Sequence, residues 1–203
     1  LVSSRRSSAD RRDTYYRVDI ARCTELFRAA AASLQPGLRL GSWPAGPAPI
    51  RGRPPRVLFL CTGNSARSQM AEALLEERSG GAVEGRSAGS HPKTLHPDAV
   101  RVMADRGIDI SGRPTKQMDR FARSRFDRVI TLCDKVRELC PEFPGRPVTS
   151  HWSMPDPAAE ADAHADTDLT SYPAFVRTAD ELETRVGLLI AQLTAQPTER
   201  RAS

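Results

Sequence analysis

The segment that decides the fold spans residues 57–68 and reads Val-Leu-Phe-Leu-Cys-Thr-Gly-Asn-Ser-Ala-Arg-Ser. Its first four residues form a continuous apolar run, which is typical of a strand buried on both faces of a parallel sheet. A polar loop follows, and then a stretch with Met70, Leu74 and Leu75 at helical spacing that ends at Gly80. The sequence therefore predicts a strand, a loop and a helix in direct succession.

Strand-like and helix-like stretches alternate through the rest of the chain. Further strands are expected over residues 83–87, 128–132 and 148–152, and helices over 97–106, 116–123 and 172–193. This alternation predicts an α/β fold, an open parallel four-stranded sheet with helices on both faces, preceded by a small β-hairpin and helix extension. Residues 155–170 are acidic and rich in alanine, and we expect a mobile surface loop there.

The N-terminal quarter has a composition of its own. Residues 1–55 carry ten arginines and four acidic residues, whereas the rest of the chain carries twenty basic and twenty-one acidic side chains and shows no basic footprint for nucleic acid. Residues 14–18 form a β-like run, and apolar residues then recur at helical spacing over residues 20–34, which predicts a helix able to pair with another helix. The segments expected are residues 1–38, a Pro/Gly-rich linker over 39–55, the main domain over 56–195 and a tail over 196–203.

Length and composition exclude several classes of protein. The chain has 203 residues, of which 39% are apolar and 27% charged, as in soluble globular proteins. It has no apolar run of about 18 residues that could span a membrane, and residues 1–13, which lack an apolar stretch, do not read as a secretion signal. Four cysteines are too few for a secreted disulfide scaffold of this length, so we expect a cytoplasmic protein with reduced thiols. The first residue is Leu1, and we expect further sequence upstream.

The loop over residues 61–68 has the composition of an oxyanion site. Cys61 and Arg67 frame it at the carboxyl end of the first strand, where open α/β sheets bind ligands. The loop N–H groups can converge on a tetrahedral anion and stabilise the Cys61 thiolate, while Arg67 can bind two of the anion's oxygens. The anion-binding residues expected are Thr62, Gly63, Asn64, Ser65, Ala66, Arg67 and Ser68. The alternative is a buried cysteine after a strand, with an arginine in solvent.

The segment from Val57 to Glu72 resembles the thioredoxin-coupled arsenate reductases of the low-molecular-weight protein tyrosine phosphatase superfamily. The resemblance covers residues 56–195 and continues through Arg-Ser-Ala-Gly at 86–89, Gly-Ile-Asp-Ile at 107–110 and His-Trp at 151–152. It implies reduction of arsenate to arsenite, as in arsenic detoxification, without a metal or a bound cofactor. The electrons would come from an external dithiol such as thioredoxin.

The resemblance also implies roles for three cysteines and one carboxylate. Cys61 would attack arsenate, and Asp156, in Met-Pro-Asp-Pro, would protonate the departing oxygen. Cys133 would then attack Cys61 and release arsenite, and Cys140 would attack Cys133 to leave a disulfide that thioredoxin can reduce. On one continuous helix these last two cysteines would lie about 10 Å apart, whereas a disulfide requires Cα atoms within about 7 Å. Any helix between them must unwind on oxidation, or the segment must already be a loop.

Other roles for these residues are open. Cys133 and Cys140 could be inert buried residues, or they could bind zinc with His151, although the spacing fits no common zinc pattern. Asp156 could be a turn residue before Pro157. For the whole domain, one alternative is a low-molecular-weight protein-tyrosine phosphatase, which would not need Cys133 and Cys140. Another is a metalloid-responsive transcriptional regulator whose α/β unit only binds an oxyanion.

In some relatives a monovalent cation stabilises the region behind the loop. Asn64, Glu72 and Ser87 match side chains of that site, but Lys116 stands where the resemblance would place a further carboxylate. An ammonium group there could take the place of the cation. We therefore expect these residues to support the loop without a requirement for potassium.

Residues 1–38 resemble the wing hairpin and last helix of ArsR-type winged-helix repressors. The resemblance implies a repressor fused to the reductase, with the helix over residues 20–34 as an element for homodimerisation. The fragment contains no recognition helix that could enter a DNA groove, so it should not bind DNA. The alternative is an incidental basic hairpin with a helical extension.

Overall fold

A four-stranded parallel sheet forms the centre of the part of the chain that the computed structural model describes, namely residues 1–7, 12–20, 22–23, 25–27, 30, 53–162 and 171–194. Its strands are β3 (Arg56–Cys61), β4 (Glu84–Gly89), β5 (Arg128–Thr131) and β6 (Val148–His151). Their order is β4-β3-β5-β6, and every pairing is parallel. The predicted parallel α/β sheet is therefore confirmed.

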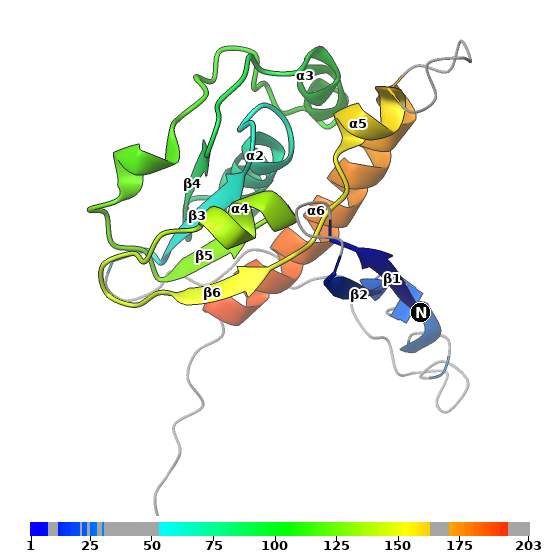
Figure 1. The fold of residues 1–203 in the computed structure, drawn as a ribbon, viewed down its shortest axis with the longest axis horizontal. Coiled ribbons are helices and arrows are strands. Elements are labelled where there is room, and N and C mark those ends of the chain that lie inside the picture. Colours follow the sequence, from blue (N-terminus) through cyan, green and yellow to red (C-terminus); the bar gives the residue numbers. More distant parts are fainter. Residues whose placement is uncertain are drawn as a thin grey trace, which may run out of the picture.

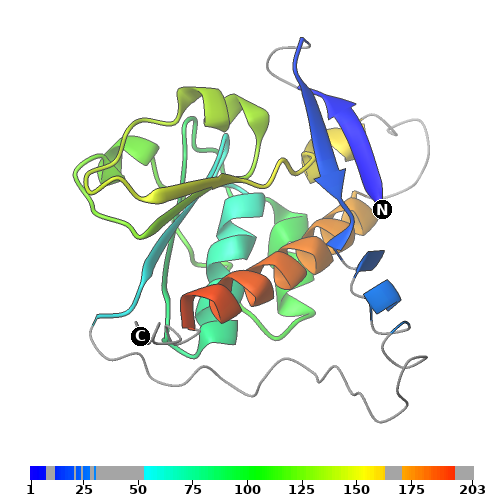
Figure 2. The same cartoon turned by 90° about the horizontal axis from the view of Figure 1, so that it is seen from below.

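Helices cover both faces of this sheet, as predicted. They are α2 (Arg67–Ser79), α3 (Pro97–Ala104), the 3-10 helix η1 (Met118–Phe121), α4 (Asp134–Leu139), α5 (Pro157–Asp162) and α6 (Tyr172–Thr194). Helices α2 and α6 pack together on one face, and α4 lies on the other (Figures 1 and 2). The short η1 occupies the middle of the helix expected over residues 116–123.

The continuous apolar run in β3 has a structural reason. Its residues Val57, Leu58, Phe59 and Leu60 are all 0% exposed, because β3 lies inside the sheet with helices on both of its faces. Burial of such side chains contributes roughly 1.5–3 kcal/mol each relative to leaving them in water. This rigid strand ends at Cys61 and so holds it at the carboxyl edge of the sheet.

One prediction was wrong. Residues 155–170 were expected to form a loop, but α5 occupies Pro157–Asp162. Proline is well tolerated in the first turn of a helix, because a backbone N–H at that position has no acceptor within the helix and its absence costs nothing. The Asp156 carboxylate accepts a hydrogen bond from the Ala158 N–H at 3.3 Å, as a helix-capping residue does. Residues 163–170 lie outside the described residues.

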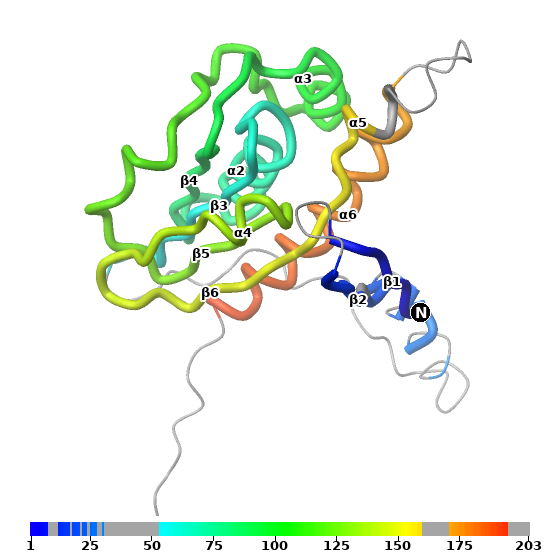
Figure 3. Tube along the Cα trace, viewed as in Figure 1, coloured from blue at the N-terminus to red at the C-terminus, as the bar shows by residue number. Residues whose placement is uncertain are grey.

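The N-terminal segment begins with an antiparallel hairpin of β1 (Val2–Arg6) and β2 (Thr14–Val18). Arg5 pairs with Tyr15 in its register. Because side chains alternate along a strand, these two residues share one face of the hairpin, and the exposed Val2, Tyr16 and Val18 share the other. The tube in Figure 3 places the hairpin at the side of the domain where the chain leaves β6.

The helix predicted over residues 20–34 is described only in part. Ile20, 22–23, 25–27 and Ala30 are helical, and residues 31–52 lie outside the described residues. The linker predicted over residues 39–55 and the tail over 196–203 fall almost wholly outside them too. Within the described segments, no helix combines the length and the apolar character needed to cross a membrane.

Candidate active site

The loop after β3 wraps around the sulfur of Cys61. This thiol is 2% exposed, accepts a hydrogen bond from the Asn64 N–H at 3.2 Å, and lies 3.0 Å from the Ser68 hydroxyl. Helix α2 starts at the end of the loop, and its N-cap residue Ala66 provides no side-chain cap. The first N–H groups of a helix favour an anion when no side chain caps them. The predicted oxyanion loop is thus shaped around the predicted nucleophile.

Asn64 fixes the shape of this loop. Its backbone adopts a left-handed conformation with φ of 45°, which asparagine tolerates better than most residues. Its amide donates to the hydroxyls of Ser68 and Ser87 at 2.9 Å each, and its carbonyl oxygen accepts from the Lys116 N–H at 2.7 Å. One buried side chain therefore connects the loop to α2, to β4 and to the segment before η1.

Glu72 and Lys116 form an ion pair behind the loop. Lys116 Nζ lies 2.8 and 3.1 Å from the two carboxylate oxygens of Glu72, which also accept a hydrogen bond from the Ser87 hydroxyl at 2.5 Å. The two charged side chains are only 13% and 5% exposed. The structure thus brings together the four residues predicted to support the loop, with an ammonium group on the carboxylate.

Arg67 and Asp156 meet on the open side of the loop. The guanidinium is 6% exposed, and it donates to the Met154 carbonyl at 2.9 Å and to the Asp156 carboxylate at 2.8 Å. The Asp156 side chain is 48% exposed. The turn role considered for Asp156 is real, since it caps α5, but the same carboxylate also lies at the guanidinium.

Cys133 lies beside the loop of Cys61. Its sulfur is 3.2 Å from the Thr62 hydroxyl, and the residue is buried. Strands β3 and β5 are adjacent in the sheet, so the residues that follow them meet at the same edge. Cys133 is also the N-cap of α4. The structure therefore brings the second predicted thiol to the mouth of the predicted anion site.

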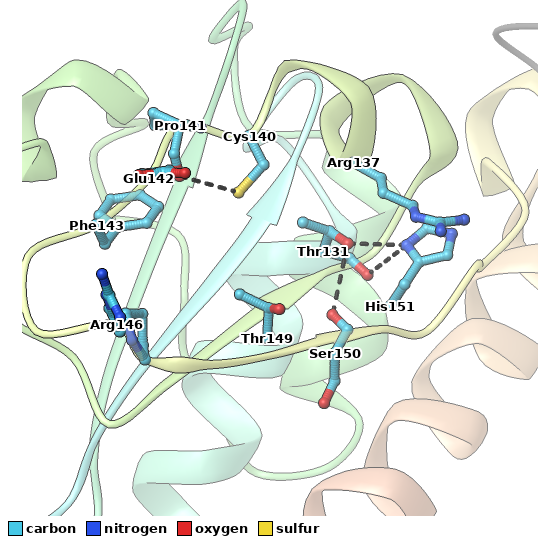
Figure 4. Close-up of a pocket in the computed structure, with 11 residues that line it drawn as sticks. Thr131, Arg137, Cys140, Pro141, Glu142, Phe143, Arg146, Thr149, Ser150 and His151 are labelled. Atoms are coloured by element: carbon cyan, nitrogen blue, oxygen red, sulfur yellow. Dashed lines mark hydrogen bonds between the residues drawn. The ribbon is translucent and has the colours of Figure 1, made fainter.

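Cys140 lies at the other end of α4, as its C-cap. It is half-buried and lines a cavity of about 680 Å³ between the end of α4 and β6. Figure 4 shows its thiol directed into this space, with Thr149 and Ser150 of β6 on the far side. Burial raises the pKa of the Cys140 thiol above its ordinary value. The sequence left open whether the segment between the two cysteines is a helix or a loop, and in the structure it is the helix α4.

A buried polar cluster next to Cys133 was missed by the sequence analysis. Asp134 is 0% exposed, and its carboxylate lies 3.2 Å from Nε2 of His151 and accepts from the Ser153 hydroxyl at 3.4 Å. Nδ1 of His151 lies 2.8 Å from the Thr131 hydroxyl. Burial lowers the pKa of His151, against the opposing effect of Asp134. The one feature of the sequence that could have indicated this cluster is the position of Asp134 directly after Cys133.

The described residues contain no group of three or more His, Cys, Asp and Glu side chains placed to hold a metal ion. His151, considered above as a zinc ligand, instead contacts Thr131 and Asp134. All four cysteines are free thiols.

Comparison with known proteins agrees with this geometry. The model of the low molecular weight phosphotyrosine protein phosphatase family matches residues 56–199. The chain belongs to this family. The matched segment contains the complete loop of Cys61 together with Asp156, and it excludes the N-terminal hairpin.

Several members of the family that resemble this chain are arsenate reductases. The arsenate reductase of Brevibacillus brevis is 37% identical over 130 residues, which are 64% of this chain and 90% of the relative. That of Bacillus subtilis is 36% identical over 130 residues, with coverage of 64% and 91%.

Solved structures of the family include both reductases and phosphatases. The thioredoxin-dependent arsenate reductase of Corynebacterium glutamicum has a TM-score of 0.55 at 27% identity, covering 84% of this chain and 70% of that one. An arginine phosphatase from Geobacillus stearothermophilus has a TM-score of 0.56 at 26% identity, with coverage of 74% and 99%. A reductase and a phosphatase therefore both share this fold with the chain.

Proposed function

We propose that this family member is an arsenate reductase that works by a thiol-disulfide relay through Cys61, Cys133 and Cys140. One observation carries the relay above all: the Cys133 sulfur lies 3.2 Å from the Thr62 hydroxyl, beside the loop that Cys61 opens. Hydrolysis of a phosphate ester needs a nucleophile, an anion site and an acid, but no second thiol. The arsenate reductases among the relatives support the same choice.

Arsenate binds first, held by the loop N–H groups and the Arg67 guanidinium. The Cys61 thiolate attacks arsenic, so that a sulfur–arsenic bond forms and an arsenic–oxygen bond breaks. Asp156 gives the departing oxygen a proton, so that it leaves as water. The 2.8 Å contact between Arg67 and Asp156 supports this role, because the carboxylate lies next to the guanidinium that would hold the substrate.

Reduction of arsenic takes place in the second step. The Cys133 thiolate attacks the Cys61 sulfur, and a disulfide forms between them. The electron pair of the sulfur–arsenic bond moves to arsenic, which leaves in the +3 state as arsenite. The two thiols have together lost two electrons, the number that arsenate gains.

The third step moves the disulfide to the surface. The Cys140 thiolate attacks the Cys133 sulfur, and the Cys61 thiolate is released. Cys133 and Cys140 flank the six residues of α4, so the helix must unwind before the two sulfurs can bond. Cys140 borders an open cavity, where an external dithiol of the thioredoxin type would reduce the disulfide and restore the enzyme.

Phosphatase activity is the second candidate, because Cys61, Arg67 and Asp156 alone have the geometry for it. The two activities are separated by measuring arsenate-dependent NADPH oxidation with thioredoxin and thioredoxin reductase, alongside hydrolysis of an aryl phosphate. The variants are Cys140→Ser and, as a matched control outside the family domain, Cys23→Ser.

We expect arsenate turnover by the parent and by Cys23→Ser, and its loss in Cys140→Ser. Turnover that survives in Cys140→Ser would mean that another thiol resolves the first disulfide. An absence of arsenate turnover in the parent, with aryl phosphate still hydrolysed, would establish a phosphatase instead.

The relation of the N-terminal segment to ArsR-type repressors remains a prediction from the sequence. Hairpin β1-β2 and the helical residues after it occur in the order that a wing and a last helix require. Homodimerisation through residues 20–34 is tested by sedimentation of the full chain at micromolar concentration, where a monomer would contradict it.

A further inference from the structure

Arg5 reaches from the N-terminal hairpin into the domain that holds the relay cysteines. Its Nη1 lies 2.5 Å from Oδ2 of Asp134 and its Nη2 lies 2.8 Å from Oδ1, so the guanidinium binds both carboxylate oxygens. Nη2 also donates to the Ser153 hydroxyl at 2.6 Å. The side chain of Asp134 is 0% exposed and that of Arg5 is 32% exposed. A carboxylate this deeply buried depends on its partners, because loss of water otherwise disfavours its charge.

Asp134 is the link between Arg5 and the thiols. It follows Cys133 directly and is the first residue of α4. Its other contacts include His151, a group whose pKa is lowered by burial and which is therefore mostly neutral at pH 7. Arg5 adds a permanent positive charge, since guanidinium groups do not lose their proton in proteins. The hairpin thus holds the first turn of the helix that separates the two relay cysteines.

Tyr15 gives the hairpin a second contact with the same helix. It is the register partner of Arg5. The centroid of its ring lies 5.2 Å from the guanidinium carbon of Arg137. The same centroid lies 5.2 Å from the centroid of the His151 ring. Arg137 belongs to the last turn of α4. One face of the hairpin therefore touches both ends of α4.

From these contacts we propose that Arg5 is a positioning residue for the relay. Through Asp134 it stabilises α4 in its helical form, and so it shifts the equilibrium between the Cys133 and Cys140 thiols and their disulfide toward the thiols. The inference rests on the proposed relay, in which α4 unwinds when the disulfide forms. A contact that exists only with the helical form favours that form by the whole free energy that the contact contributes.

Loss of the Arg5 side chain should therefore favour the disulfide. The thiol–disulfide equilibrium constant should change by about tenfold. This is the effect expected when one charge-assisted, bidentate ion pair is lost and one of its members, here Arg5, is partly exposed to water. Arg5→Lys, which keeps the charge but loses the bidentate fork, should give a smaller change in the same direction. Arg6 is the matched control, because it is exposed on the opposite face of the same strand and its guanidinium donates to the Arg12 carbonyl.

The test uses the full chain with Cys61→Ser and Cys23→Ser, so that Cys133 and Cys140 form the only dithiol. Each variant is equilibrated in mixtures of reduced and oxidised dithiothreitol, free thiols are alkylated, and the fraction of disulfide is measured by mass spectrometry. Arg5→Ala, Arg5→Lys and Arg6→Ala are compared with the parent, and Arg5→Ala is also made with Asp134→Asn. If Arg5 acts through Asp134, its removal should have little further effect once the carboxylate is gone.

The outcomes separate this inference from the proposed function. A tenfold shift in Arg5→Ala, a smaller one in Arg5→Lys and none in Arg6→Ala would support the positioning role. An unchanged equilibrium in both Arg5 variants, or the same shift in Arg6→Ala, would overturn it and leave the relay intact. If the unsubstituted chain forms no Cys133–Cys140 disulfide after a turnover of arsenate without reductant, the relay itself fails.

Discussion

The carboxylate of Asp156 lies 2.8 Å from the guanidinium of Arg67, so the proposed proton donor and the proposed anion-binding cation are in direct contact. An arsenate oxygen bound by Arg67 would compete for the same N–H groups. Because the Asp156 side chain is 48% exposed, it has room to turn from the guanidinium toward the departing oxygen. In the proposed mechanism the pair therefore connects substrate binding with proton transfer.

Replacement of Asp156 by asparagine should separate these two roles. The amide cannot give a proton to the departing oxygen, so kcat for arsenate reduction should fall by about 10²–10⁴-fold, the usual contribution of a general acid. Substrate binding should change little, because Arg67 and the loop remain. Steady-state kinetics of Asp156→Asn and of the exposed control Asp119→Asn would check this. A rise in KM with kcat unchanged would contradict a role in proton transfer.

The sequence predicted most accurately the elements with long or continuous apolar patterns. Strand β3 and helices α2 and α6 lie where the patterns placed them. Burial of β3 on both faces leaves a continuous apolar run in the sequence, and burial along one face of a helix leaves a helical period. Helix α5 was missed, because its six residues include two acids and are too few to show a period. Its structural signals were instead the capping Asp156 and Pro157 in the first turn.

Within the candidate site, local motifs were predictable and distant contacts were not. Cys61 and Arg67 lie at the two ends of one loop, and the resemblance supplied Cys133, Cys140 and Asp156 as candidates. The contact of Arg5 with Asp134 joins residues 129 positions apart. Nothing in the spacing of the sequence indicates such a pair, since it depends on where the hairpin packs against the domain. The sheet order, which brings Cys133 to Thr62, likewise emerges only from the folded topology.

The reactivity of Cys140 should depend on pH in a way that reflects its burial. Burial raises the pKa of this thiol, so the thiolate fraction at pH 7 is lower than for an exposed cysteine. In a variant with the other three cysteines replaced by serine, the alkylation rate by iodoacetamide should rise about tenfold per pH unit and level off only above pH 9.0. A plateau of the alkylation rate below that pH would contradict a raised pKa and would show that the surroundings of Cys140 favour its thiolate.

Lys116 should make potassium unnecessary for activity. Turnover by the parent is expected to be equal in potassium chloride and in choline chloride at the same ionic strength. In Lys116→Met the buried Glu72 carboxylate loses its ammonium partner, which should lower the free energy of unfolding by about 3 kcal/mol. Potassium should then restore part of the loss. Urea unfolding in both salts would measure this free energy, with Arg120→Met as an exposed control. If turnover by the parent requires potassium, Lys116 does not replace the cation.

Gly89 sets how closely β4 can approach the nucleophile loop. A Cβ atom at this position would lie 2.6 Å from the Thr62 carbonyl oxygen and 2.8 Å from the Asn64 nitrogen, both of which are backbone atoms that cannot rotate away. In Gly89→Ala the loop must therefore move, and misplacement by about 1 Å can reduce kcat about 10²-fold. The overpacking should also cost about 1–3 kcal/mol of stability.

Gly112→Ala is the matched control for this substitution. A Cβ atom there would meet nothing within 4 Å, so both activity and stability should stay close to those of the parent. Turnover and urea unfolding of the two variants would be compared directly.

Because Asn64 donates its N–H to the Cys61 sulfur, a shift of the loop acts first on the nucleophile. Gly89→Ala should therefore lose arsenate reduction and aryl phosphate hydrolysis together, whereas Cys140→Ser loses only the former. Retention of either activity at the parental level in Gly89→Ala would mean that the loop adjusts without moving the Cys61 sulfur.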